Sequence, residues 1–368
     1  MEIYWIAVLI SLCLSFVLTS QNVKISDGRF GKITLTRVWM AFIPLFLLAF
    51  FRWNVGVDVV YGTGYYYIEY SAIQMGKGNV FGYEIGFYLL MELCNALHLN
   101  LYCFYCISTV VFFVLFIKFL ISNTNNITLA ILIFFLSDLY LFTFSTLRQS
   151  LAIAFFLYPM AEVIKGNKFV SNWKFWIYAI ISVSMHISII YLIIVLLVSR
   201  IRFRKNTFFL IAIFGFIATP LIRIALEKLI SYNYYFAKYF NTNEYGSEFT
   251  PTYFFVTLIF LIPMCVFYNK FIEKDDKNYI FVNLSLFFVL LMLNSQVLIM
   301  PYRIFPLFVP AYIMLIPNFI ESLKLKKSGK ALMYLYYILP LLFLFANTYS
   351  SSSIYEYKSI FEYTHQVW

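Results

Sequence analysis

The sequence carries very little charge. Only 12% of its 368 residues are Asp, Glu, Lys or Arg, and 62% are hydrophobic, whereas an ordinary soluble domain carries about 25% charged residues. The hydrophobic residues form long blocks, and about 20 such residues are needed to cross a hydrocarbon core as a helix. Alternating strands of the kind that form outer-membrane barrels are missing. The sequence therefore predicts an all-α integral membrane protein, a polytopic helical bundle of about 10–12 transmembrane segments.

The motifs of nucleotide and metal chemistry are also missing. The sequence has no GxGxxG, no GxxxxGK[ST] and no HExxH, so we expect no cofactor and no metal. Of its five cysteines, the one close pair is Cys103 and Cys106, which lies in a hydrophobic block without a second ligand pair. Such thiols are better explained as small buried side chains.

The net charge of +10 comes from short basic clusters between the hydrophobic blocks. This arrangement is typical of topology signals, so we expect no binding to nucleic acid. The clusters at 24–37, 165–174, 200–205, 270–277 and 324–330 are expected to be cytoplasmic. The loops at about 52–82 and 227–250 then face outward, and residues 1–368 form a single polytopic domain.

The charge rule makes two hydrophobic blocks unusual. About 25 residues around His186 separate two basic clusters, too few for two full crossings. We predict a pair of short helices that fold back near His186 as a re-entrant feature lining an outward-facing cavity. A single long tilted helix is the alternative. By the same argument, block 83–100 should not cross fully.

The outer loop is rich in glycine and tyrosine. Seven of the thirteen glycines lie between Gly56 and Gly86, and seven tyrosines lie between Tyr61 and Tyr88, together with several acidic residues. Tyrosine presents a flat apolar face and a hydroxyl, which suit both sugar rings and a membrane interface. The interleaved carboxylates favour a carbohydrate site, with Tyr65, Tyr66 and Glu69 as sugar-binding candidates.

Ionisable residues in hydrophobic blocks mark functional cavities. Arg52, Arg148 and Arg303 are candidates for binding a diphosphate, because guanidinium binds phosphate oxygens bidentately. Each could instead be an interfacial anchor at a helix end, which is the more natural explanation for a fourth arginine, Arg223. His186 is a candidate catalytic base. Asp58 and Glu84 are rival bases, and the sequence does not choose among the three.

Several short motifs occur together in a fixed order. Arg52-x3-Gly56-x-Asp58 precedes the tyrosine-rich stretch, and Glu84-x-Gly86-Phe87 follows it; Arg148-Gln149-Ser150-Leu151-Ala152 and His186-Ile187-Ser188 come later. This series resembles the EpsG-type polysaccharide polymerases, a branch of the Wzy-type group. Ile85 stands where the family often has proline, and Arg303 falls near a further late arginine of the family.

The resemblance implies a nucleotide-independent glycosyltransferase of the bacterial inner membrane. Such an enzyme joins undecaprenyl-diphosphate-linked oligosaccharide repeat units at the outer leaflet, in the synthesis of O-antigen, capsule or exopolysaccharide. Its partners would be the lipid-linked oligosaccharide, membrane lipids and, by family analogy, a chain-length regulator.

Two other functions remain open. One is a transporter or flippase of lipid-linked sugars, although no internal repeat supports it. The other is a membrane acyltransferase that modifies polysaccharide, which also uses an intramembrane histidine.

Overall fold

The described residues of the protein, a computed structural model, fold almost entirely as α-helix. They are residues 2–19, 32–124, 126–137, 139–165, 171–221, 224–225, 228, 251–274, 278–293, 301–349 and 356–362. Within these ranges no strand forms, and the one isolated bridge joins Arg52 to Ser359. The predicted all-α membrane fold is confirmed.

The chain forms two compact units. The first comprises residues 1–162, 168–190 and 345–368. Its helices are α1 (Glu2–Thr19), α2 (Lys32–Phe50), α3 (Tyr65–Gln74), α4 (Ile85–Ala96), α5 (Leu101–Asn123), α6 (Ile127–Leu136), α7 (Leu139–Ser145), most of α8 (Leu147–Ile164) and α9 (Trp173–Met185), with the short 3-10 turn η1 (Val57–Val59).

Aromatic rings form the core of the first unit. Helix α1 packs against α2 and α6, and α2 packs against α5. Phe42 of α2 meets Phe113 and Phe116 of α5 and Phe134 of α6, with Phe116 and Phe134 only 4.5 Å apart between centroids. In a lipid environment such dense packing, rather than hydrophobic exclusion from water, holds helices together.

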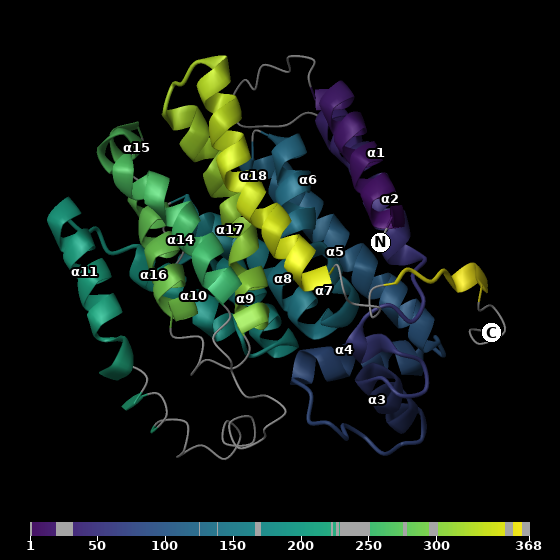
Figure 1. Ribbon diagram of the computed structural model, residues 1–368. Helices are drawn as coiled ribbons and strands as arrows, with labels where there is room; N and C mark the ends of the chain where they lie inside the picture. Colours follow the sequence, from purple (N-terminus) through teal and green to yellow (C-terminus); the bar gives the residue numbers. More distant parts are fainter. Residues whose placement is uncertain are drawn as a thin grey trace. The chain divides into compact units, whose positions relative to one another are not determined.

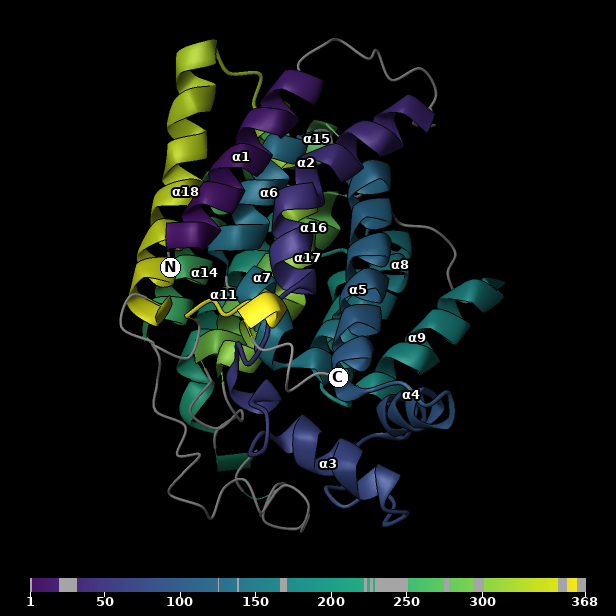
Figure 2. The same cartoon turned by 90° about the vertical axis from the view of Figure 1, so that its right-hand side faces the viewer.

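The helices α3 and α4 lie at one end of the first unit's bundle (Figures 1 and 2).

Asparagine side chains cap the starts of α5 and α6. Asn100 Oδ1 accepts the Cys103 amide at 2.9 Å in α5, and Asn126 Oδ1 accepts the Leu129 amide at 2.9 Å in α6. The segment after α2 pairs with the C-terminal segment, where Trp53 N donates to Lys358 O.

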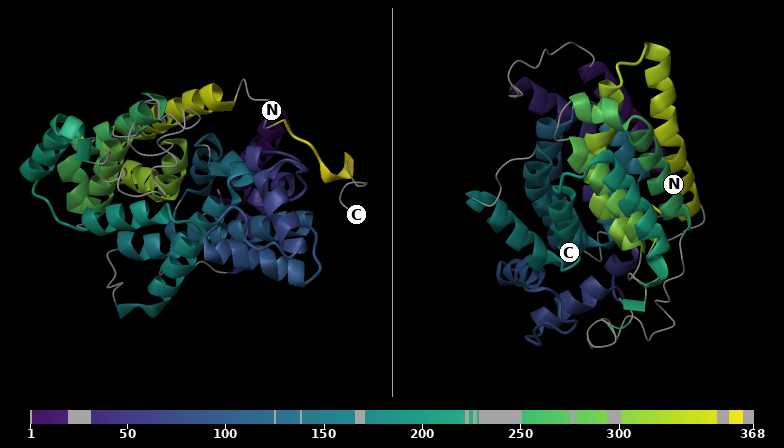
Figure 3. Two further views of the ribbon diagram at one scale, coloured as in Figure 1. Left: turned by 90° about the horizontal axis from the view of Figure 1, so that it is seen from below. Right: turned by 90° about the vertical axis from the view of Figure 1, so that its left-hand side faces the viewer.

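The second unit comprises residues 163–167 and 191–344. It contains α11 (Lys205–Ile217), α14 (Pro251–Val266), α15 (Tyr268–Lys274), α16 (Asn278–Leu293) and α17 (Pro301–Ser322), and most of α10 (Ile189–Ser199) and α18 (Lys327–Tyr349). Helices α14, α16 and α17 pack on one another (green in Figure 3). Asn283 anchors α16 by donating to the carbonyl oxygens of Ser199 and Ile201.

Four described helices are long and apolar enough to cross a membrane: residues 101–123, 147–164, 304–322 and 327–348. A fifth span results if α6 and α7, bent by 51°, are counted as one. Eight further apolar helices have only 10–17 residues. The expected count of about 10–12 segments therefore stays a prediction.

Both unusual blocks are broken or short in the structure. Helix α9 ends at Met185 and α10 begins at Ile189, so two short helices replace one continuous helix around His186, and the predicted fold-back in the membrane stays a prediction. Helix α4 has 12 residues, which at 1.5 Å per residue span about 18 Å. It is too short to cross a ~30 Å hydrocarbon core, as predicted for block 83–100.

Candidate functional site

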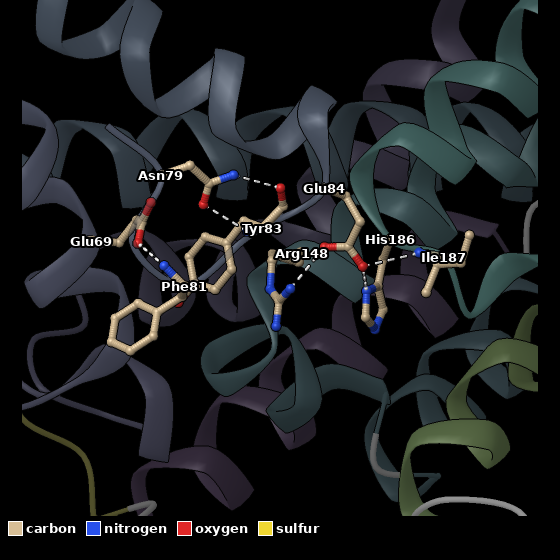
Figure 4. Close-up of polar contacts among 8 residues, drawn as sticks. All are labelled: Glu69, Asn79, Phe81, Tyr83, Glu84, Arg148, His186 and Ile187. Atoms are coloured by element: carbon tan, nitrogen blue, oxygen red, sulfur yellow. Dashed lines mark hydrogen bonds and ion pairs between the residues drawn. The ribbon is translucent and has the colours of Figure 1, made fainter. Parts of the chain in front are cut away.

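The carboxylate of Glu84 connects two basic side chains of the first unit (Figure 4). Its Oε2 accepts a hydrogen bond from Arg148 Nη1 at 2.8 Å, and its Oε1 lies 2.5 Å from His186 Nδ1. The Ile187 amide also donates to Oε1 at 3.2 Å. Residues separated by more than 100 positions in the chain thus form one polar cluster.

Each member of this cluster stands at a helix terminus. Glu84 is the N-cap residue of α4, and Arg148 is the second residue of α8. His186 is the C-cap of α9 in extended conformation, and the break that follows it frees the Ile187 amide from helical hydrogen bonding. The three side chains are 14%, 22% and 13% exposed, respectively, so the cluster is largely desolvated but reachable.

Gly86 allows α4 to approach α9 closely. A Cβ atom at Gly86 would lie 2.3 Å from Ser184 Oγ and 2.9 Å from both Ser184 Cβ and Ser184 O. Gly86 and Ser184 each lie two residues from a cluster member, so this close approach brings Glu84 to His186. One glycine of the outer loop is therefore required by packing.

Gly56 allows a second close approach, between the loop after α2 and α7. Its φ of +107° is open to glycine, and a Cβ there would lie 2.9 Å from Ser145 Cα. The loop after α2 consequently rests directly on the end of α7, three residues before Arg148.

Glu84, which lies in a loop outside the candidate spans, has a strongly acidic carboxyl group. Burial opposes its ionisation, but the hydrogen bond and charge of His186 and the charge of Arg148 outweigh burial and lower the pKa of Glu84 to about 2. Glu84 is therefore a carboxylate at neutral pH.

Tyr83 supplies an aromatic wall to the cluster. The Arg148 guanidinium lies over its ring, 4.2 Å from the centroid, which is a cation–π contact. The rings of Phe81 and Tyr66 pack on Tyr83, at 5.8 and 6.0 Å between centroids. Sequence reasoning did not single out Tyr83, although it directly precedes Glu84.

Of the predicted residues, the structure brings together Glu84, Arg148 and His186. Arg52 lies elsewhere in the first unit and is 3% exposed. Its guanidinium donates to Ala49 O, to Thr109 Oγ1 at 2.9 Å and to Thr143 O at 3.4 Å. It also lies over the ring of Phe144 at 4.7 Å. The described contacts of Arg52 thus join the end of α2 to α5 and α7.

The predicted sugar-binding residues lie in different environments. Tyr65 is 48% exposed, whereas Tyr66 is 1% and Glu69 0% exposed. Asp58 is half-buried in η1, and its charge acts on Tyr66 and Tyr83.

Some predictions fall outside the described residues. Arg303 lies in α17 of the second unit, but its side chain is not among those described, and neither is Arg223. The same holds for most of the predicted 227–250 loop.

The family comparison covers most of the chain. The EpsG family model matches residues 37–365, a span that includes every residue of the cluster. Comparison with curated proteins and with solved structures gave no significant match. The family is associated with polysaccharide synthesis at membranes. The resemblance seen in the short motifs is confirmed, and the chain belongs to the EpsG family.

Proposed function

We propose that this protein is a polysaccharide polymerase, a glycosyltransferase that joins undecaprenyl-diphosphate-linked repeat units at the outer leaflet of the bacterial inner membrane. The observation that carries the proposal is the Glu84 carboxylate shared between His186 and Arg148. The shared carboxylate holds a proton acceptor, His186, beside a fixed positive charge, Arg148. Transfer of a sugar chain from a lipid diphosphate to a hydroxyl requires both.

His186 is the proposed general base. In the neutral form that would act as base, the imidazole keeps its proton on Nδ1 and donates it to Oε1 of the ionised Glu84, so the lone pair is on Nε2. Glu84 itself is a poor base because its pKa is about 2. Its role is to orient the imidazole and to stabilise the imidazolium that forms, as a carboxylate does in a catalytic triad.

Arg148 is the proposed binding group for the diphosphate. A guanidinium has five N–H donors; Nη1 donates to Glu84, and Nε has no hydrogen-bond partner among the described residues. Tyr83 and Glu84 fix the plane of the guanidinium from two sides. Such a preorganised cation stabilises the charge that develops on a departing diphosphate.

The proposed reaction is a displacement at the anomeric carbon of the donor chain. The oxygen of the acceptor hydroxyl bonds to the anomeric carbon of the donor chain while its proton passes to His186 Nε2. The bond between the anomeric carbon and the diphosphate oxygen breaks, and the lipid diphosphate leaves with the electron pair beside Arg148. No nucleotide or metal takes part.

Exposed aromatic rings near the cluster are the proposed sugar contacts. Tyr65 and Phe81 are 48% and 40% exposed and meet edge to face at 5.4 Å. Phe81 in turn packs on Tyr83, which lies against Arg148. Tyr66 is buried and instead supports Tyr83.

Reconstitution with lipid-linked repeat units alone tests the proposal. Purified protein in nanodiscs should convert them to a ladder of longer chains without nucleotide sugar or acyl donor. Arg148→Ala and His186→Asn should abolish the ladder, and Arg148→Lys should give only short products, because lysine binds as a point charge. Arg204→Ala is the matched control, since Arg204 is exposed at the start of α11. A normal ladder from Arg148→Ala would refute the proposal, and transport of the units without elongation would support the flippase instead.

A further inference from the structure

The loop that joins α3 to α4 carries two members of the site region, Tyr83 and Glu84, yet it contains little regular structure. Residues 77–84 form no helix, and Gly76, Gly78 and Gly82 around it have positive φ. Glycines of this kind leave a free loop many conformations. Something else must hold Glu84 at hydrogen-bond distance from both Arg148 and His186.

Glu69 of α3 fixes the middle of this loop. Its side chain is 0% exposed, and its two oxygens each accept a backbone amide: Oε1 from Val80 at 3.1 Å and Oε2 from Phe81 at 3.0 Å. A buried carboxylate is costly unless it is fully hydrogen-bonded. The two loop amides satisfy it, so the loop and the carboxylate hold each other in place (Figure 4).

Asn79 fixes the end of the loop. Its Oδ1 accepts the Tyr83 amide at 2.7 Å, and its Nδ2 donates to Tyr83 O at 2.8 Å. Both polar groups of the Tyr83 backbone are therefore bound by one side chain, and the next residue is Glu84. This closed ring of hydrogen bonds sets the direction in which Tyr83 and Glu84 leave the loop.

We propose that Glu69 and Asn79 are positioning residues that hold Tyr83 and Glu84 against Arg148 and His186. The proposal rests on the function proposed above and replaces the sugar-binding role that the sequence predicted for Glu69. Both oxygens of that carboxylate are engaged by loop amides and shielded from solvent. Glu69 acts on the reaction through Glu84.

Histidine NMR tests this coupling without any substrate. The chain has three histidines, His98, His186 and His365, so His186→Asn identifies the His186 signals. In the unaltered protein, ¹⁵N-labelled His186 should show a proton on Nδ1 in a short hydrogen bond to Glu84. Glu69→Gln should weaken or abolish that signal, because the amide NH2 opposes one of the two loop amides.

Asn79 offers a graded pair of variants. Asn79→Asp keeps the acceptor for the Tyr83 amide, whereas Asn79→Leu removes both hydrogen bonds. The His186 signal should therefore fall less in Asn79→Asp than in Asn79→Leu. Turnover of lipid-linked repeat units should fall in parallel, at least tenfold in kcat for Glu69→Gln, with KM little changed. Glu92→Gln, an exposed carboxylate on α4, should leave both signal and kcat unaltered.

Two results would overturn the proposal. One is a Glu69→Gln protein with an intact His186 signal and normal kcat. The other is a rise in KM with the His186 signal intact, which would return Glu69 to direct sugar contact. Because the NMR signal needs no substrate, an active Arg148→Ala protein would refute the proposed function while leaving the coupling measurable.

Discussion

Replacing Gly86 with alanine should separate α4 from α9 and slow elongation while leaving the protein folded. The new Cβ would meet Ser184 Oγ at 2.3 Å, and Ser184 Cβ and O at 2.9 Å. The hydroxyl can rotate away, but the other two atoms move only with the backbone. Ordinary contact distances then require a displacement of about 0.5 Å.

That displacement acts directly on the site. Oε1 of Glu84 lies 2.5 Å from His186 Nδ1 and 3.2 Å from the Ile187 amide. A shift of about 0.5 Å would break the second contact and lengthen the first. Since misplacement by about 1 Å can cost about 10²-fold in rate, we expect a loss of about tenfold. Overpacking should cost about 1–3 kcal/mol in stability.

Elongation rate and thermal unfolding of the purified variant measure the two effects. Gly329→Ala is the matched control, because its Cβ would meet only Leu325, at 3.3 Å or more. The double variant Gly86→Ala/Ser184→Gly removes two of the three close contacts and should recover part of the lost rate. Normal elongation by Gly86→Ala, or a double variant as slow as the single one, would refute the steric reasoning.

Glu84→Gln should lower elongation at least tenfold at neutral pH, because it leaves His186 without its carboxylate; an unaltered rate would contradict the orienting role. Above the pKa that Glu84 has in the unfolded chain, its carboxylate form stabilises the folded state by up to about 3 kcal/mol. This stabilisation should be lost as pH falls from about 4.5 towards 2. The acid unfolding of Glu84→Gln should lack this pH dependence. Arg52→Met should lower the melting temperature, since it leaves the Thr143 carbonyl and the Thr109 hydroxyl without this donor. Each buried group left without a donor costs about 1–3 kcal/mol. An unchanged melting temperature would rule out this anchoring role.

The sequence by itself determined the class of the protein and included the members of the cluster among its candidate residues. Scarcity of charge and long hydrophobic blocks predict a helical membrane protein because a bilayer accepts little else. The short block around His186 predicted a helix break, since length and charge parity are properties of the chain alone. Glu84, Arg148 and His186 were all selected because ionisable residues in such blocks are costly.

Only the tertiary structure decided what these residues do to one another. Arg52, Arg148 and Glu69 were all candidate binding residues in the sequence, yet the fold places Arg52 and Glu69 in buried contacts and Arg148 beside Glu84. Arg148 and His186, the hydrogen-bond partners of Glu84, lie 64 and 102 residues from it in the chain. No local sequence pattern specifies these pairs. The sequence named three rival bases, His186, Asp58 and Glu84. The contacts of the Glu84 carboxylate with Arg148 and His186 exist only where α4, α8 and α9 meet.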